Sequence, residues 1–164
     1  MKSEPIVCLR HRYRPPIESG QDATPPQSYA WILGDPDPEV LSSSYRIRAA
    51  DLGAAQQQSR RLRPTADDAP FLIEIEVLVD STAAAARREL ARIQASDTSR
   101  GLGSPVGGIN YVGTVDGLAG LIADIRAVGI ADGAVLVPMS AHPTQDLIIR
   151  CLASSLACRI HRNS

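Results

Sequence analysis

The stretch over residues 111–138 constrains the fold most, because it reads as a strand, a helix and a second strand in direct succession. An apolar run over residues 109–112 ends at Gly113, and Thr114 then has the side chain of a helix cap. The continuous apolar run over residues 134–137 is typical of a strand buried on both faces. Between them, apolar side chains recur every three or four residues and share one helix face: Val115, Leu118, Ala119, Ile122, Ile125 and Val128. Such a crossover unit predicts a parallel sheet in an α/β fold.

The same alternation of strand and helix extends over most of the chain. The expected strands, each with its following helix, cover residues 31–34 and 38–52, 71–79 and 82–94, 109–112 and 115–128, and 134–137 and 143–157. We therefore expect about four strand–helix units in a domain over residues 29–164. Residues 1–28 read as an irregular N-terminal segment, rich in proline and turn formers, in which residues 6–9 resemble a short strand.

Several short motifs follow one another in order: WILG at residues 31–34, AADLG at 49–53, YVGT at 111–114 and AVLVP at 134–138. Together with the strand over residues 71–80 and its Ala/Arg-rich helix, they resemble the luciferase-like monooxygenase family. The resemblance covers residues 29–157 and corresponds to the C-terminal half of that family. It implies a TIM barrel fold, a flavin or deazaflavin cofactor and a small organic substrate.

Chain length limits how much of a barrel can be present. A complete barrel of eight strand–helix units takes about 250 residues, whereas this chain has 164. The expected fold class is therefore α/β, a partial (about half) TIM-type (β/α) barrel. An open half-barrel exposes strand edges and apolar faces, so we expect a partner, either a second copy in a homo-oligomer or a complementary half-barrel chain.

An unrelated small open α/β ligand-binding domain is the competing interpretation of the fold. Strand order distinguishes the two, because a half-barrel is wound in sequence and a doubly wound sheet reverses at a switch point.

Composition excludes several other classes of protein. The chain has 44% hydrophobic and 21% charged residues and a formal net charge of −1, which indicates neither a nucleic-acid-binding nor a membrane protein. The three cysteines, Cys8, Cys151 and Cys158, show no C-x-x-C spacing. We therefore expect reduced thiols in a cytoplasmic setting and no metal site.

Ligand sites of barrels lie at the C-terminal ends of the strands. Gly113 and Thr114 follow one expected strand, and Ser140 and His142 follow the next. We predict that Gly113, Thr114 and Ser140 bind the phosphate-bearing cofactor, FMN or deazaflavin, and that His142 is a weak catalytic candidate for proton transfer. The alternatives are that Thr114 only caps a helix and that His142 is an exposed turn residue.

Two acidic side chains, Glu74 and Glu76, share one face of the strand over residues 71–79. In a closed barrel they would point inward and offer acid–base chemistry or metal ligands. We favour the alternative that they face solvent on an uncovered sheet, since ionised carboxylates are rarely buried without partners. The glycine-rich stretch over residues 97–108 is expected to be a flexible loop rather than a ligand site.

Two functions of different classes follow. The first is a luciferase-like flavin-dependent oxidoreductase or monooxygenase domain, whose chemistry the cofactor carries. The second is a non-catalytic half-barrel, a relic or partner subunit that serves assembly. The family resemblance favours the enzyme, whereas the absence of counterparts to the family's N-terminal units favours the partner subunit.

Overall fold

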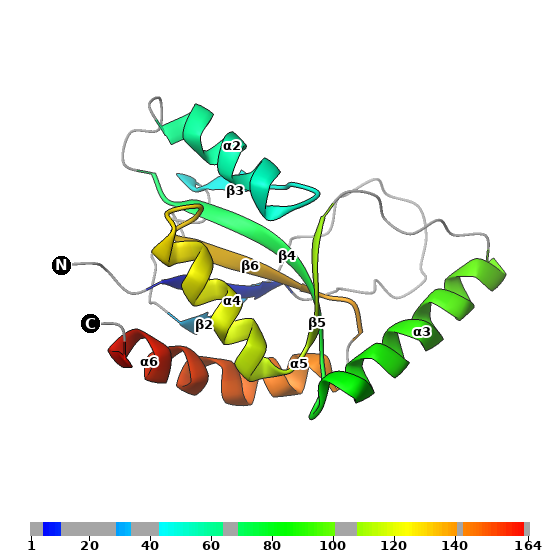
Figure 1. Ribbon diagram of the computed structural model, residues 1–164. Helices are drawn as coiled ribbons and strands as arrows, with labels where there is room; N and C mark the ends of the chain where they lie inside the picture. Colours follow the sequence, from blue (N-terminus) through cyan, green and yellow to red (C-terminus); the bar gives the residue numbers. More distant parts are fainter. Residues whose placement is uncertain are drawn as a thin grey trace, which may run out of the picture.

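A sheet of six strands forms the centre of the computed structural model, which describes residues 5–10, 29–33, 43–63, 69–100, 108–140 and 143–162 (Figure 1). The strands are β1 (Ile6–Arg10), β2 (Tyr29–Leu33), β3 (Tyr45–Ile47), β4 (Phe71–Val79), β5 (Ile109–Gly113) and β6 (Gly133–Pro138). The helices are α2 (Leu52–Leu62), α3 (Ala83–Arg100), α4 (Val115–Ala127), α5 (Thr144–Leu147) and α6 (Ala153–Arg162), with a π-helical turn, η2 (Ile148–Leu152), between the last two.

Four parallel strands form an arc in the order β3, β4, β6 and β1. The first three follow chain order, and β1 lies beyond the last of them, as the first strand of a closed barrel lies beside its last. Strand β5 stands outside this arc and pairs with the C-terminal half of β4, on the side where β3 pairs with the N-terminal half. The arc confirms the expected α/β fold, consistent with a partial TIM-type barrel, and the reversal of strand order is confined to β5.

The first expected strand–helix unit is wrong as a unit, although its strand is present as β2. Strand β2 pairs antiparallel with β1 at the edge of the sheet, so it starts no parallel unit. Within the helix predicted over residues 38–52, residues 45–47 form β3, because Tyr45 and Ile47 face the core while Arg46 faces the other side of the sheet. This alternation has the period of a strand. Asp51, expected near the end of that helix, instead caps the next one, its carboxylate accepting from the Ala54 N–H at 2.8 Å.

The later units are confirmed, with shifted bounds. Helix α3 extends to Arg100, so the first four residues of the expected loop over 97–108 are helical, and residues 101–107 lie outside the described residues. Gly129 closes α4 with a φ of 71°, which favours glycine. Val128 was expected on the buried face of α4 but lies beyond the last helical residue and is 60% exposed.

Residues 6–9 form a strand as expected, and β1 lies inside the sheet between β2 and β6. Most of residues 1–28 lies outside the described residues, so the proposed division at residue 28 stays a prediction. No helix in the described part of the chain is both long and apolar enough to span a bilayer.

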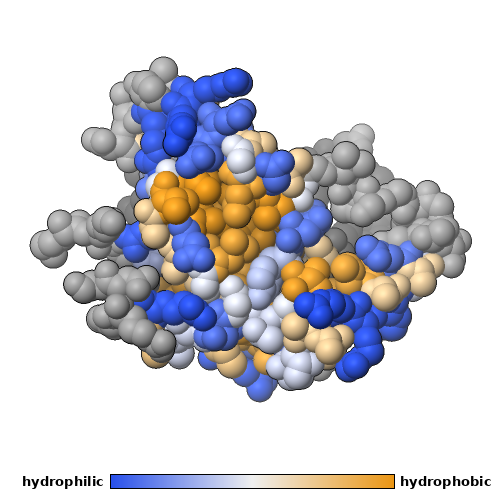
Figure 2. Space-filling view, viewed as in Figure 1, coloured by the Kyte–Doolittle hydropathy of each residue, from blue (hydrophilic) through white to orange (hydrophobic). Residues whose placement is uncertain are grey.

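The main hydrophobic core lies on one face of the sheet, under α2, α4, η2 and α6. Helix α4 contributes Leu118, Ile122 and Ile125, and the last helical segment contributes Leu152 and Leu156. Figure 2 shows apolar side chains gathered around the position of α4, below the polar surface of α2. A smaller cluster of Cys8, Leu72 and Val135 lies on the opposite face, so the strands of the arc carry side chains that are buried on both sides.

We expect Gly133→Ala to weaken the sheet, because a Cβ at this position would collide with the backbone carbonyl oxygen of Ile6. Overpacking typically costs about 1–3 kcal/mol, and a backbone atom cannot rotate away. Urea unfolding followed by circular dichroism should show a lower midpoint. Gly108→Ala is the matched control, since the nearest atoms to its Cβ belong to the Glu76 side chain at 3.7 Å. Equal midpoints would contradict the close approach of β1 and β6.

Candidate functional site

The C-terminal end of β4 brings together the segments that carry the predicted cofactor residues. The Asp80 N–H donates to the carbonyl oxygen of Gly113 at 3.1 Å. On the other side, the hydroxyl of buried Thr144 accepts from the Val79 N–H at 3.2 Å and donates to the Val79 carbonyl oxygen at 3.1 Å. Ser140 Oγ lies 3.3 Å from the Thr144 hydroxyl. Gly113 and Ser140 are thus tied to two consecutive residues of one strand end.

Thr114 is confirmed as the cap of α4, its Oγ1 accepting from the Gly117 N–H at 3.3 Å. The Tyr111 hydroxyl donates to the carbonyl oxygen of Thr114 at 3.0 Å. A Cβ on Gly113 would lie 2.7 Å from that hydroxyl oxygen, and one on Gly117 would collide with it. The two glycines therefore make room for Tyr111 at the N-terminus of α4, where unpaired N–H groups and the helix dipole favour an anion.

Two residues of this strand-end cluster were missed from the sequence. The sequence predicts only a strand at Tyr111, and no local pattern signals the bond from its hydroxyl to the Thr114 carbonyl oxygen. Thr144 follows Pro143 at the start of the last helix and was not singled out, because its partner Val79 lies 65 residues away in the chain. His142 lies outside the described residues, so its predicted role is neither supported nor contradicted.

The second candidate site surrounds Glu74, in the middle of β4. This residue is only 8% exposed, and the prediction that it faces solvent on an uncovered sheet is wrong. Arg48 Nε donates to Glu74 Oε2 at 2.8 Å and Arg48 Nη2 donates to Oε1, while Arg10 Nη1 donates to Oε1 at 3.2 Å. The carboxylate is buried because arginines satisfy it. Glu76, two residues further along, is half-buried.

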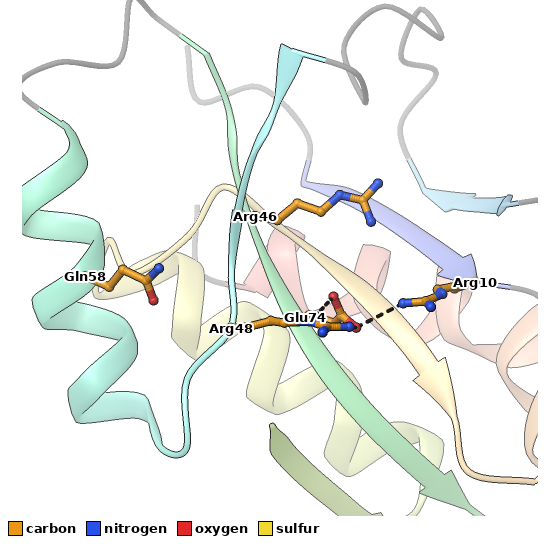
Figure 3. A pocket seen from close by; sticks show the side chains of 5 residues that line it. All are labelled: Arg10, Arg46, Arg48, Gln58 and Glu74. Carbon is orange, nitrogen blue, oxygen red and sulfur yellow. Dashed lines mark hydrogen bonds and ion pairs between the residues drawn. The ribbon is translucent and has the colours of Figure 1, made fainter. Parts of the chain in front are cut away.

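Strand register explains why these side chains meet. Ile47 is opposite Ile73, so Arg48, the next residue after β3, comes level with Glu74. Across the sheet, Glu74 is opposite Val135, which in turn is opposite Cys8 on β1. Arg10 lies two residues beyond Cys8 on the same face, and its guanidinium reaches back toward the carboxylate from the side opposite Arg48 (Figure 3).

An open pocket of about 560 Å³ lies over this cluster. Its described lining residues are Arg10, Arg46, Arg48, Gln58 and Glu74, which come from β1, β3 with its following residue, α2 and β4 (Figure 3). The volume lies within the usual range of small-molecule sites, about 300–1,000 Å³. The described lining carries three guanidinium groups and one carboxylate.

Electrostatics fix the protonation states on this face. Burial tends to raise the pKa of Glu74, but hydrogen bonds and charge from Arg48, with the charges of Arg10 and Arg46, outweigh it and hold the pKa below its ordinary value. Burial raises the pKa of the Cys8 thiol to about 11, although the charge of Arg46 acts in the opposite direction. Cys8 therefore stays a neutral thiol near neutral pH and is not an activated nucleophile. The described residues hold no group of three or more potential metal ligands.

We expect Glu74→Gln to destabilise the fold by about 1–2 kcal/mol near neutral pH, less than a fully buried pair would cost because Arg48 is 65% exposed. Since the folded-state pKa is lowered, the stabilisation is present above the unfolded-state pKa and is lost as the pH falls through the folded-state value. Urea unfolding at several pH values should therefore show the difference between wild type and variant shrinking in acid.

Glu89→Gln is the matched control for Glu74→Gln, because Glu89 is hydrogen-bonded by Arg92 within α3, and both Arg92–Glu89 bonds are solvent-exposed. It should change the unfolding midpoint little. An equal loss in both variants, or a Glu74→Gln difference independent of pH, would contradict the buried and paired state of Glu74.

We further expect Thr144→Val to cost about 1–3 kcal/mol, because it removes a buried hydroxyl that bonds both backbone groups of Val79. Ser140→Ala, which removes a half-buried hydroxyl 3.3 Å from Thr144, should cost less, and Thr144→Ser should restore much of the loss. Urea midpoints of the three variants test this order. A loss in Ser140→Ala as large as that in Thr144→Val would refute it.

Comparison with known proteins supports the fold. No protein-family model matches the chain, and no curated protein matches its sequence. Among solved structures, the chain is similar to the EDTA monooxygenase EmoA from Chelativorans sp. BNC1, with a TM-score of 0.55 and 14% sequence identity. The match covers 74% of this chain and 42% of that chain, so this chain spans less than half of its structural neighbour. The similarity shows a distant relation in fold to part of a luciferase-like TIM barrel.

Proposed function

We propose that the chain is a luciferase-like flavin-dependent oxidoreductase or monooxygenase domain that acts on a small organic substrate. The observation that carries the proposal is the arc of parallel strands, which resembles part of the EDTA monooxygenase and presents polar residues at the C-terminal end of β4. In barrels that end of the sheet is where ligands bind. A cytoplasmic setting suits the free thiols of Cys8, Cys151 and Cys158.

The donor set at the strand end fits a phosphate-bearing cofactor, FMN or deazaflavin. Gly113 and Thr114 lead into the N-terminus of α4, and Tyr111 and Ser140 add hydroxyl groups on the two sides of the end of β4. When bound, the flavin would supply the redox chemistry. The chain would hold the phosphate with backbone N–H groups and the hydroxyls of Thr114 and Ser140, and offer His142 for proton transfer.

The cofactor pocket of a barrel is enclosed by loops from all around the barrel, and the described arc of strands corresponds to only part of one. The chain spans 42% of its structural neighbour, so we propose that a second copy or a complementary half-barrel chain completes the site. The open edges of the described sheet favour such a partner, since β2 pairs only with β1 and the three-residue β3 pairs only with β4. If the assembly binds no flavin, the non-catalytic partner-subunit role is the one that remains.

The test is a fluorescence titration of the purified chain with FMN and with a deazaflavin, together with its solution mass. We expect saturable binding with a dissociation constant on the order of micromolar, by an assembly rather than a monomer. Ser140→Ala should weaken binding about tenfold, and Gly113→Ala at least as much, because its Cβ would displace the Tyr111 hydroxyl.

Gly108→Ala serves as the control variant and should bind like the wild type, since its Cβ meets only ordinary van der Waals contacts. Unfolding midpoints measured in parallel separate lost binding from lost folding. No binding at millimolar flavin would rule out the stand-alone enzyme and leave assembly as the role of the chain.

A further inference from the structure

Helix α3 is long but contributes little to the core of its own chain. It has 18 residues, which span about 27 Å at 1.5 Å per residue. Among residues 83–96, whose side chains are described, only Ala86 is buried and none belongs to either hydrophobic cluster. The main contacts of α3 are with β5 and β4, and it extends away from the sheet on the other side of β5 from α4 (Figure 1). Since packing supplies most of the stability of a helix in a protein, the outer face of α3 is a candidate docking surface.

The outer face of α3 is lined by small side chains and carries one cation. Ala84, Arg88, Ala91 and Ala95 follow one another at intervals of four, three and four residues, so they share one face, and all four are exposed. The Arg88 side chain has no hydrogen bond or ion pair within the part of the chain that the structure describes. Alanines at these positions let another helix approach closely.

The outer face of α4 has the same spacing and the complementary character. Gly117, Leu121, Asp124 and Val128 are again separated by four, three and four residues. Val128 is 60% exposed, Asp124 is exposed and Leu121 is half-buried. The carboxylate of Asp124, like the guanidinium group of Arg88, makes no hydrogen bond or ion pair with the described residues. This face therefore carries two large apolar side chains and one anion.

We infer that α3 of one copy of the chain docks antiparallel on α4 of a second copy, with Arg88 paired to Asp124. Antiparallel packing reverses the order of one face relative to the other, and the two faces have equal spacing. Small side chains then meet large ones on both sides of the ion pair. The pairs in this register are Ala84 with Val128, Arg88 with Asp124, Ala91 with Leu121 and Ala95 with Gly117.

Other pairings of the same two faces leave the charges without partners. In a parallel alignment, Arg88 would lie opposite Leu121 and Asp124 opposite Ala91. An antiparallel pair of two α3 helices would place Arg88 opposite Ala91, and a pair of two α4 helices would place Asp124 opposite Leu121. Removing a charge from water against an apolar group is costly unless an opposite charge compensates it. Charge complementarity therefore selects the antiparallel contact between α3 and α4.

The contact can occur twice in a closed pair, since each copy supplies one α3 and one α4. Two-fold interfaces are self-complementary in this way, and they are the commonest form of oligomer. Specific interfaces usually bury about 1,200–2,000 Å² in total. A contact three helical turns long thus favours the reciprocal arrangement, which doubles the buried area.

The choice of a second copy as the partner builds on the proposed function, which leaves the partner open. In the antiparallel register, Ala95 of the second copy comes opposite Gly117, in the first turn of α4. The C-terminal end of the second copy's α3 then lies beside Gly113 and Thr114. The second copy would in this way add to the wall of the proposed cofactor site.

Sedimentation equilibrium of the full chain without flavin tests the inference. We expect a monomer–dimer equilibrium with a dissociation constant on the order of micromolar. Arg88→Glu and Asp124→Arg should each weaken the dimer about a hundredfold, about tenfold for each of two contacts that become repulsive. Both positions are exposed, so both variants should keep the circular dichroism spectrum of the wild type.

An equimolar mixture of Arg88→Glu and Asp124→Arg should dimerise again. In a mixed pair, Glu at position 88 faces Arg at position 124 in one contact, and the native Arg88 and Asp124 meet in the other. Arg60→Glu is the matched control, because it makes the same change of charge at an exposed position on α2. It should dimerise like the wild type.

A wild type that stays monomeric at about 1 mM would overturn the inference and leave a complementary chain as the partner. Dimerisation of either variant as tight as that of the wild type would also overturn it, since the dimer would then use another surface, such as a strand edge. A mixture that stays monomeric would do the same. A dimer that binds no flavin would defeat only the proposed enzyme, whereas flavin binding by a monomer would defeat only this inference.

Discussion

Strand β4 is the element on which the rest of the structure depends. It pairs with β6 along one side and with β3 and then β5 along the other, and all of these pairings are parallel. Eight of its nine residues are buried, which is typical of a strand covered on both faces. Because backbone groups on both edges of β4 are paired, this strand fixes the register of β3, β5 and β6 in the sheet. Both candidate sites are built on it.

The two faces of β4 differ in chemistry. Toward the helices, Phe71, Ile73, Ile75, Val77 and Val79 enter a continuous apolar core. Toward the opposite face, the apolar patch of Leu72, Cys8 and Val135 is bordered by the cluster of Glu74 with its arginines. A carboxylate tolerates that position only with cations beside it. Arg10 and Arg48 therefore allow β4 to be buried with Glu74 in its middle. The same arginines line the pocket over this cluster.

Local patterns in the sequence predicted the units from residue 71 onward, and they failed where pairing at a distance decided the outcome. Helix α4 was readable because its cap, its apolar spacing and its closing glycine all lie within one short stretch. Strand β3 was not, because three residues give too little periodicity to distinguish strand from helix. Glu74 was misassigned for a related reason: its partners Arg48 and Arg10 lie 26 and 64 residues away in the chain.

The sequence by itself determined the α/β class, the approximate number of strand–helix units, the cap of α4 and the resemblance to luciferase-like proteins. These depend on interactions between residues within about two helical turns or along one strand, whose periods are visible in the chain. Only the tertiary structure decided that β1 enters the sheet beside β6, that Tyr111 lies over two glycines and that two arginines bond one glutamate. Those outcomes depend on strand register, which is fixed by pairing between distant segments and by the burial of one face against another.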